Sequence, residues 1–413
     1  MVSVPCYKCK GKLLCGREFC PVYSRYRAMS KAMELASLDM LSTSPPAIFI
    51  GSKLCYPKVN VGILVPPQKT EQASIYENPK LWVEKNFAIK KIVELRSSLI
   101  NSRFKANVHE ARSLTRKLIS LQEIAMSCTT TDVEIKLKKK PSFSLKFDGV
   151  TMPFGASATL QNFELAENPN IPRLIEKIYY DTDLKAEEAV FMLNKKGFDE
   201  HKIVQLFSTG ILGLKKNRKL VSTRWGITAI DDILAKRYMQ EIKHHETLEN
   251  WQLFYGNYFG NHYIVLLFPR VFAYELFELY LPGSVWNFTG SIEIATDFED
   301  FYGRKTYAEN TVGGYYAARL ALLEYLLAIK KQAACLMIRF ETPEYAAPLG
   351  VWVVRNAARN AFKNSPMMFE NLKLALEKAK EIALKNFNFN LDNILKESKL
   401  LRLIKEQKLL TSY

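Results

Sequence analysis

The sequence predicts an α+β fold that combines helices with antiparallel and mixed sheets, and two observations carry this prediction. Segments whose apolar residues recur at helical spacing alternate with short apolar or alternating segments bounded by Gly, Pro and Asn, which are typical of strands. The chain of 413 residues is 48% hydrophobic and exceeds the size at which one core usually stops growing. We therefore expect two domains, preceded by a four-cysteine element and followed by a helical C-terminal region.

Four of the seven cysteines form the first element, at positions Cys6, Cys9, Cys15 and Cys20. In a reducing compartment, closely spaced cysteines bind metal more often than they form disulfides. Four thiolates suit tetrahedral Zn²⁺, and the basic residues between them offset the negative charge of the site. An iron–sulfur cluster and a pair of disulfides are the alternatives. We expect a structural zinc element over residues 1–25.

The next elements are helices and strands in mixed order. Helical spacing predicts a helix over 24–38, and two apolar segments within 43–67 predict a pair of short strands. Leucines at three-to-four spacing predict two long basic helices, over 80–104 and 108–126. Strict alternation over 131–148 predicts a hairpin with a lysine-rich turn.

The middle of the chain contains a helical pair, over 184–196 and 199–209, followed by a basic, strand-like segment at 214–225. One interpretation is a helix-turn-helix with a basic wing, and the other is a helical hairpin packed on a sheet. Residues 251–296 are dense in aromatic and β-branched residues with turn signals between them, which favours an antiparallel meander.

The last third begins with a long helix over 313–331 and a buried strand over 334–340. The apolar segment 349–354 predicts a second strand. Proline after serine predicts a helix that begins at residue 366, and a final helix is expected over 391–407.

The formal net charge of +16 favours polyanionic partners, because each Lys or Arg placed on a phosphate releases condensed counterions. The positive surplus is concentrated in two short runs, residues 136–140 and 214–219. Nucleic acid is the expected partner, and solvated loops are the alternative. Charges interrupt the longest apolar stretches and the first residues, so we expect no membrane segment and a cytoplasmic location.

Gln407, Leu410 and Tyr413 have the spacing of peptides that bind sliding clamps. One short helical turn places the aliphatic and aromatic side chains in a single apolar pocket, while the glutamine reaches a polar notch. Such peptides usually carry two adjacent aromatic residues, whereas Tyr413 is a single one. The alternative is the end of a packed helix over 391–407, which has an apolar stripe.

Five segments resemble the archaeal Nre family of DNA repair proteins. They are CYKCKGKLLCGREFCP, TSPPAIFIGSKLCYPKVNVG, VSTRWGITAIDD, GGYYAARLALLEYL and ETPEYAAPLGVWVVRNAARNAF. The resemblance implies a role in DNA damage repair, a zinc element built from the four cysteines, and docking on the sliding clamp (PCNA) through the C-terminal peptide. It also implies four segments along the chain, namely a zinc element (1–25), an N-terminal family domain (26–295), a C-terminal family domain (296–400) and a clamp-binding tail (401–413).

Whether the protein is an enzyme is left open, because the sequence has no phosphate-binding loop, zinc-protease motif or serine nucleophile elbow. Charged residues in apolar, turn-rich segments form a candidate phosphate or nucleotide pocket, in which arginines receive phosphate. These residues are Arg224, Asp231, Asp232, Arg319, Arg339 and Arg355. A buried ion-pair network is the alternative interpretation.

The resulting hypothesis is a DNA repair factor that binds nucleic acid through basic surfaces and is recruited by the sliding clamp. The competing hypothesis is an enzyme that acts on a nucleotide or a nucleic-acid end, in a pocket near 43–62 and 221–232.

Overall fold

The computed structural model describes residues 9, 11–14, 18–52, 54–143, 154–287 and 289–406. These residues form 13 α-helices and two six-stranded sheets, each of them mixed, which confirms the predicted α+β class. The chain divides into two compact units. Of the described residues, the N-terminal unit comprises those up to Ile233 together with Ala347–Leu349, and the C-terminal unit comprises Leu234–Ala346 and those from Gly350 onward.

The sheet of the N-terminal unit has the strand order β1-β5-β6-β4-β3-β2. All neighbouring strands are antiparallel except β4 and β6. The strands are β1 (Asp39–Ser44), β2 (Ala47–Ile50), β3 (Lys58–Val65), β4 (Ile100–Asn107), β5 (Thr131–Leu137) and β6 (Ser157–Leu165). Val133, Ile135 and Leu137 of β5 are buried while the residues between them are more exposed, as the alternation in the sequence predicts.

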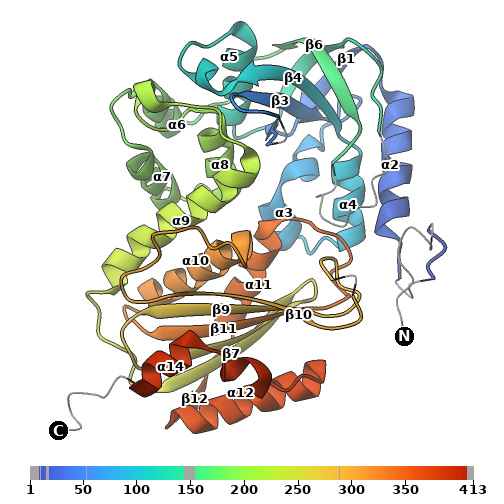
Figure 1. The fold of residues 1–413 in the computed structure, drawn as a ribbon. Helices are drawn as coiled ribbons and strands as arrows, with labels where there is room; N and C mark the ends of the chain where they lie inside the picture. The colour runs from blue at the N-terminus through green and yellow to red at the C-terminus, as the bar shows by residue number, and fades with distance from the viewer. Residues whose placement is uncertain are drawn as a thin grey trace. The chain divides into compact units, whose positions relative to one another are not determined.

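Helices of this unit surround the sheet. They are α2 (Pro21–Leu35), α3 (Pro79–Glu84), α4 (Ile89–Ser97), α5 (Arg116–Met126), α6 (Arg173–Tyr180), α7 (Ala186–Lys195) and α8 (Glu200–Ser208). Helix α8 packs on α5, α7 and strand β2, and α6 and α7 lie beside it (Figure 1). The predicted helical pair is therefore a hairpin that packs on the sheet.

Three predictions for this unit are wrong in whole or in part. The expected helix over 108–126 is shorter, since α5 begins only at Arg116. The expected helix over 80–104 is interrupted, and residues 100–107 form β4 instead, because pairing with β3 and β6 outweighs the local helical spacing. The basic segment at 214–225 is not a strand. It contains the 3₁₀ turn η3 (Lys215–Asn217) and the start of α9 (Thr223–Ile242), so no basic β-wing forms there.

The sheet of the C-terminal unit has the order β10-β9-β11-β8-β7-β12. Its strands are β7 (Trp251–Tyr258), β8 (Asn261–Phe268), β9 (Ala273–Tyr280), β10 (Glu293–Glu299), β11 (Ala334–Glu341) and β12 (Met367–Phe369). Strand β11, buried along its whole length, lies between β8 and β9 and runs parallel to β9. The predicted antiparallel meander over 251–296 is therefore wrong at the β8–β9 step.

Helices cover both faces of this sheet (Figure 1). Helices α10 (Val312–Ala328) and α11 (Val351–Lys363) lie on one face, with α11 packed on β7 and β8. On the opposite face, apolar residues of the strands form a buried core with α12 (Leu372–Phe387), α13 (Asp392–Leu395) and α14 (Lys399–Glu406). Gly256 permits the close packing of α11, since a Cβ there would lie 2.5 Å from the backbone of Ala361.

Three predictions differ from the structure here. The apolar segment 349–354 belongs largely to α11 rather than to a strand, because short apolar runs do not distinguish the two states. Helix α12 begins at Leu372, where the Asn371 side chain accepts the N–H of Leu374, and not at residue 366. The expected helix over 391–407 is two short helices, α13 and α14.

The compact units divide inside α9, between Ile233 and Leu234. The predicted division at residue 295 concerns the sequence domains of the family and stays a prediction. No helix in the described ranges is long and apolar enough to cross a membrane.

Candidate functional site

The described cysteines of the zinc prediction are Cys9 and Cys20. The Cys9 sulfur is buried and accepts the N–H of Leu14 at 3.2 Å, and the Cys20 sulfur accepts the N–H of Tyr23 at 3.4 Å. Backbone N–H groups that point at sulfur stabilise the thiolate form, which is the form that binds metal. Both cysteines therefore fit the chemistry of zinc ligands.

The other two predicted ligands, Cys6 and Cys15, lie outside the described residues. Within the part of the chain that the structure describes, no group of three or more His, Cys, Asp or Glu residues is arranged to hold a metal ion. That search does not include Cys6 and Cys15, so the four-cysteine site stays a prediction.

The predicted clamp peptide, with Gln407, Leu410 and Tyr413, also lies outside the described residues, whereas the helix before it lies within them. Helix α14 ends at Glu406 and packs into the core of the C-terminal unit through its buried residues Leu400, Leu401 and Ile404. The apolar stripe of the sequence is thus used in the core.

Glu275 on β9 fixes the beginning of α14. Its buried carboxylate accepts the N–H groups of Lys399 and Leu400, at 2.9 and 3.1 Å, and the hydroxyl of Ser398. Burial raises the pKa of Glu275, and these hydrogen bonds to the charged form act in the opposite direction. The carboxylate satisfies donors at the helix N-terminus, where negative charge is favoured.

Arg339 lies in a buried charged cluster on the α10 side of the C-terminal sheet. Its guanidinium donates to the carboxylates of Glu278 and Glu341, the latter at 2.8 Å, and to the side-chain oxygen of Asn261. Burial alone lowers the pKa of Arg339, but the two carboxylates raise it well above its ordinary value. Burial also raises the pKa of Glu341, to about 7.

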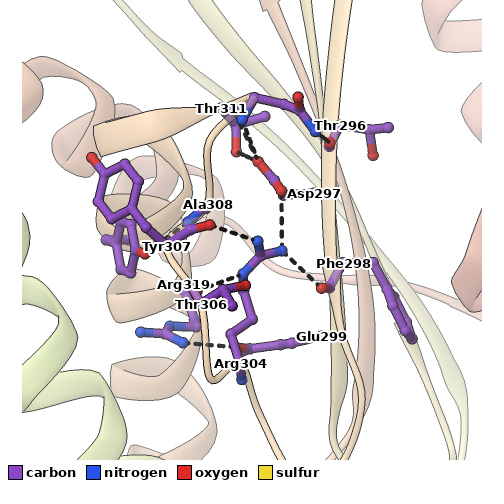
Figure 2. Close-up of polar contacts among 12 residues, drawn as sticks. Thr296, Asp297, Phe298, Glu299, Arg304, Thr306, Tyr307, Ala308, Thr311 and Arg319 are labelled. Carbon is purple, nitrogen blue, oxygen red and sulfur yellow. Dashed lines mark hydrogen bonds and ion pairs between the residues drawn. The ribbon is translucent and has the colours of Figure 1, made fainter.

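A second charged cluster fixes the loop between β10 and α10 (Figure 2). Arg304 pairs with Asp297 at 3.0 Å and donates to the carbonyls of Phe298 and Tyr307. The other oxygen of Asp297 accepts the N–H and the hydroxyl of Thr311, both at 2.9 Å, beside the first turn of α10.

Arg319 on α10 pairs with Glu299 at 2.8 Å, and both side chains are buried (Figure 2). Of the six residues in the candidate phosphate pocket, Arg319 and Arg339 thus already hold carboxylates. Arg355 is buried on α11 of the same unit. The contacts of Arg319 and Arg339 form a buried ion-pair network, which is the alternative interpretation of these residues.

Arg224, Asp231 and Asp232 belong to the N-terminal unit, where they lie on α9. Arg224 is exposed in the first turn, Asp231 is fully buried and Asp232 is half-buried. The six predicted pocket residues therefore come from both units, three from each.

The segments 43–62 and 221–232 do meet in the N-terminal unit. The N–H of Ile50, at the end of β2, donates to the hydroxyl of Thr223 at 3.2 Å, at the start of α9. A shallow surface hollow of about 460 Å³ lies elsewhere, over β1, β5 and β6, and is lined by residues such as Leu41 and Glu134.

The basic run at 214–219 forms an ordered loop around Arg218. This side chain is only 8% exposed, and its guanidinium donates to the carbonyls of Gly213, Tyr179 and Asp181 at 2.9 to 3.0 Å. The carbonyl of Arg218 in turn accepts the Nε–H of Arg112 at 3.2 Å. The remaining cations of the run, Lys215, Lys216 and Lys219, are exposed.

The surface around this loop includes residues that the sequence analysis did not single out. We call it the Tyr180 surface, formed by the exposed residues Arg112, Tyr180, Lys215, Lys216 and Lys219. Tyr180 and Arg112 are far from the lysines in the chain, and no sequence motif connects them. The sequence therefore contains no signal that could have identified this surface.

The geometry defines a class of protein: two mixed α+β units, one of which carries a basic surface with an exposed aromatic residue and the other a buried network of ion pairs. The chain belongs to the archaeal Nre family. The family model described as "Archaeal Nre, N-terminal" matches residues 14–287, and "Archaeal Nre, C-terminal" matches residues 299–413. The resemblance inferred from the sequence is thereby confirmed.

Three curated relatives match most of the chain. It is 40% identical to DNA repair protein NreA of Archaeoglobus fulgidus, covering 92% of this chain and 94% of the relative. It is 38% identical to DNA repair protein NreB of the same organism, covering 90% and 91%. It is also 38% identical to DNA repair protein NreA of Haloferax volcanii, covering 77% of each. No solved structure matches the chain.

Proposed function

We propose that this protein is a DNA damage repair factor that binds DNA through basic surfaces of its N-terminal unit and is recruited by the sliding clamp (PCNA) through Gln407, Leu410 and Tyr413. The names of its relatives support the repair role. The observation that carries DNA binding is the loop around Arg218, which presents Lys215, Lys216 and Lys219 to solvent on an ordered backbone.

An ordered cationic loop suits a phosphate backbone. Lysines whose backbone is already fixed lose less conformational freedom when they meet phosphates than lysines on an unstructured loop. The formal net charge of +16 adds long-range attraction for a polyanion.

The anchoring of α14 supports clamp recruitment. Glu275 and the core hold α14 in place up to Glu406, the residue directly before the Gln407 motif in the sequence. A short recognition peptide that follows a fixed helix is presented at a defined place on the protein.

Zinc bound by Cys6, Cys9, Cys15 and Cys20 is the cofactor that we propose. The N–H···S hydrogen bonds to Cys9 and Cys20 support this assignment, because they suit thiolates. Zinc bound there would supply folding energy to an element too short for a core of its own.

A second candidate function is an enzyme that acts on a nucleotide or a nucleic-acid end near 43–62 and 221–232. One observation favours it: the hydrogen bond from Ile50 to Thr223 joins these two segments. A nucleotide that copurifies with the protein, identified by mass spectrometry, would favour this function over the first.

A salt titration tests the proposed DNA binding. We expect log K for a DNA oligonucleotide to fall steeply with log salt, because binding releases counterions. K215A/K216A should weaken binding and make the slope less steep. K373A/K385A is the matched control, because it removes two exposed lysines from α12 of the C-terminal unit. A flat slope for the unaltered protein would contradict the proposal.

A further inference from the structure

Tyr180, the last residue of α6, is 72% exposed, although its backbone is firmly held. The carbonyls on both sides of it, from Tyr179 and Asp181, accept the two Nη groups of Arg218 at 3.0 and 2.9 Å. Its ring meets the Tyr179 ring edge to face at 5.2 Å between centroids. The guanidinium of Arg218 lies 6.0 Å from the centre of the Tyr179 ring. An exposed aromatic ring is thus kept in a defined position.

Arg218 also links the loop that carries the lysines to the backbone around Tyr180. Its Nε–H donates to the carbonyl of Gly213 at 2.9 Å, and the N–H of Lys215 donates to the carbonyl of Thr182 at 2.9 Å. Gly213 has a φ of +96°, a conformation that favours glycine at the start of the loop. The exposed amines of Lys215 and Lys216 therefore belong to a loop that is bonded to the residues around Tyr180.

Asp181, the acidic residue directly after Tyr180 in the chain, is engaged by the backbone. Asp181 Oδ1 accepts the N–H groups of Asp183 and Leu184, at 3.1 and 2.9 Å. Its charge is directed at the turn after α6, where it orders the backbone that follows Tyr180. The Tyr180 surface as defined above consists of one aromatic residue and four cations, and the exposed Asp183 lies on the turn that follows Tyr180.

We infer that the Tyr180 surface binds single-stranded DNA, with an unpaired base stacked on Tyr180 and the adjacent phosphates on Lys215 and Lys216. An exposed ring face can stack on a base only when that base is not enclosed in a duplex, whereas the cations alone would serve either form. The inference rests on the proposed DNA binding and specifies its substrate class.

The test compares a single-stranded oligo(dT) with a duplex of equal length, using the full chain. Tyr180→Ala should weaken single-strand binding roughly 5- to 100-fold, as expected for the loss of one stacked base. Tyr180→Phe should retain the affinity, since the ring remains. K215A/K216A should reduce the salt slope for the single strand by about 0.7 for each lost phosphate contact.

The matched control is Tyr302→Ala, which removes a ring that is 83% exposed in the C-terminal unit. It should leave oligo(dT) affinity unchanged, and melting temperatures should show that every variant is folded. Failure of the unaltered protein to bind any DNA would overturn the proposed function itself. If DNA is bound with a steep salt slope, three results would overturn this inference alone: an unchanged affinity of Tyr180→Ala, an equal loss on duplex, or tighter binding of the matching single-stranded RNA.

Discussion

Arg339 is buried between Glu278 and Glu341, and this places three ionisable groups where water cannot screen them. Burial, together with the negative charge of Glu278, raises the pKa of Glu341, although Arg339 acts in the opposite direction. Gly314 at the start of α10 belongs to the same arrangement, because a side chain there would collide with the Glu278 carboxylate. Gly314, in the segment GGYYAARLALLEYL, therefore has no room for a side chain beside the Glu278 carboxylate of β9.

Glu341 should make the stability of the protein depend on pH. Burial raises its pKa to about 7 from 4.5, so the folded state binds the proton more tightly than the unfolded chain. The free energy of unfolding should therefore fall as pH rises from about 4.5 through 7, by on the order of 1 to 3 kcal/mol. Urea unfolding at pH 5 and pH 8 measures this loss.

Glu341→Gln should remove that part of the pH dependence, because the glutamine carries no proton to lose. Glu370→Gln, an exposed site in the same unit, is the control and should leave the pH dependence as it is. Equal pH dependence in the unaltered protein and in Glu341→Gln would show that another group is responsible.

At the scale of elements, the predictions succeed where the local sequence pattern is strong. They fail where strand pairing or packing determines the secondary structure. The alternation in β5 and the helical spacing in α2 and α10 are sufficient to predict the type of each of these elements. Local spacing predicts a helix where strand β4 forms, because the pairing partners of β4, β3 and β6, are distant in the sequence. The insertion of β11 between β8 and β9 is likewise invisible to local patterns.

The N-terminal cysteine element should contain one tightly held zinc per chain. Cys9→Ser and Cys20→Ser should each lower the zinc content measured by elemental analysis, while the remainder of the chain stays folded, because a short metal element has little core of its own. Cys128→Ser, an exposed single cysteine, is the control. Iron in place of zinc, or full zinc content in both ligand variants, would contradict the assignment.

Helix α14 should depend on Glu275. Replacing this residue by glutamine keeps its size but removes the charge that three donors share, so the helix should open more often. We expect faster hydrogen exchange over 399–406, corresponding to roughly 1 to 2 kcal/mol of lost protection. Glu377→Gln on α12 is the exposed control, and unchanged exchange in Glu275→Gln would show that the core alone holds α14.

At the scale of the whole molecule, the sequence indicated the family, the positive charge and the candidate zinc and clamp residues. It did not indicate the Tyr180 surface, because Arg218 assembles this surface from segments separated by 37 residues or more. It also did not show that Arg319 and Arg339 hold carboxylates, because ion pairs between distant segments leave no spacing pattern.

The central claim is that one molecule binds DNA and the sliding clamp together. Its most direct test is the affinity of the full chain for primed DNA with and without a loaded clamp. We expect the clamp to raise the affinity on the order of 10-fold or more, because the second contact becomes intramolecular. L410A/Y413A should lose this gain and keep the affinity for bare DNA. No gain in the unaltered protein, or a full gain in L410A/Y413A, would contradict the account.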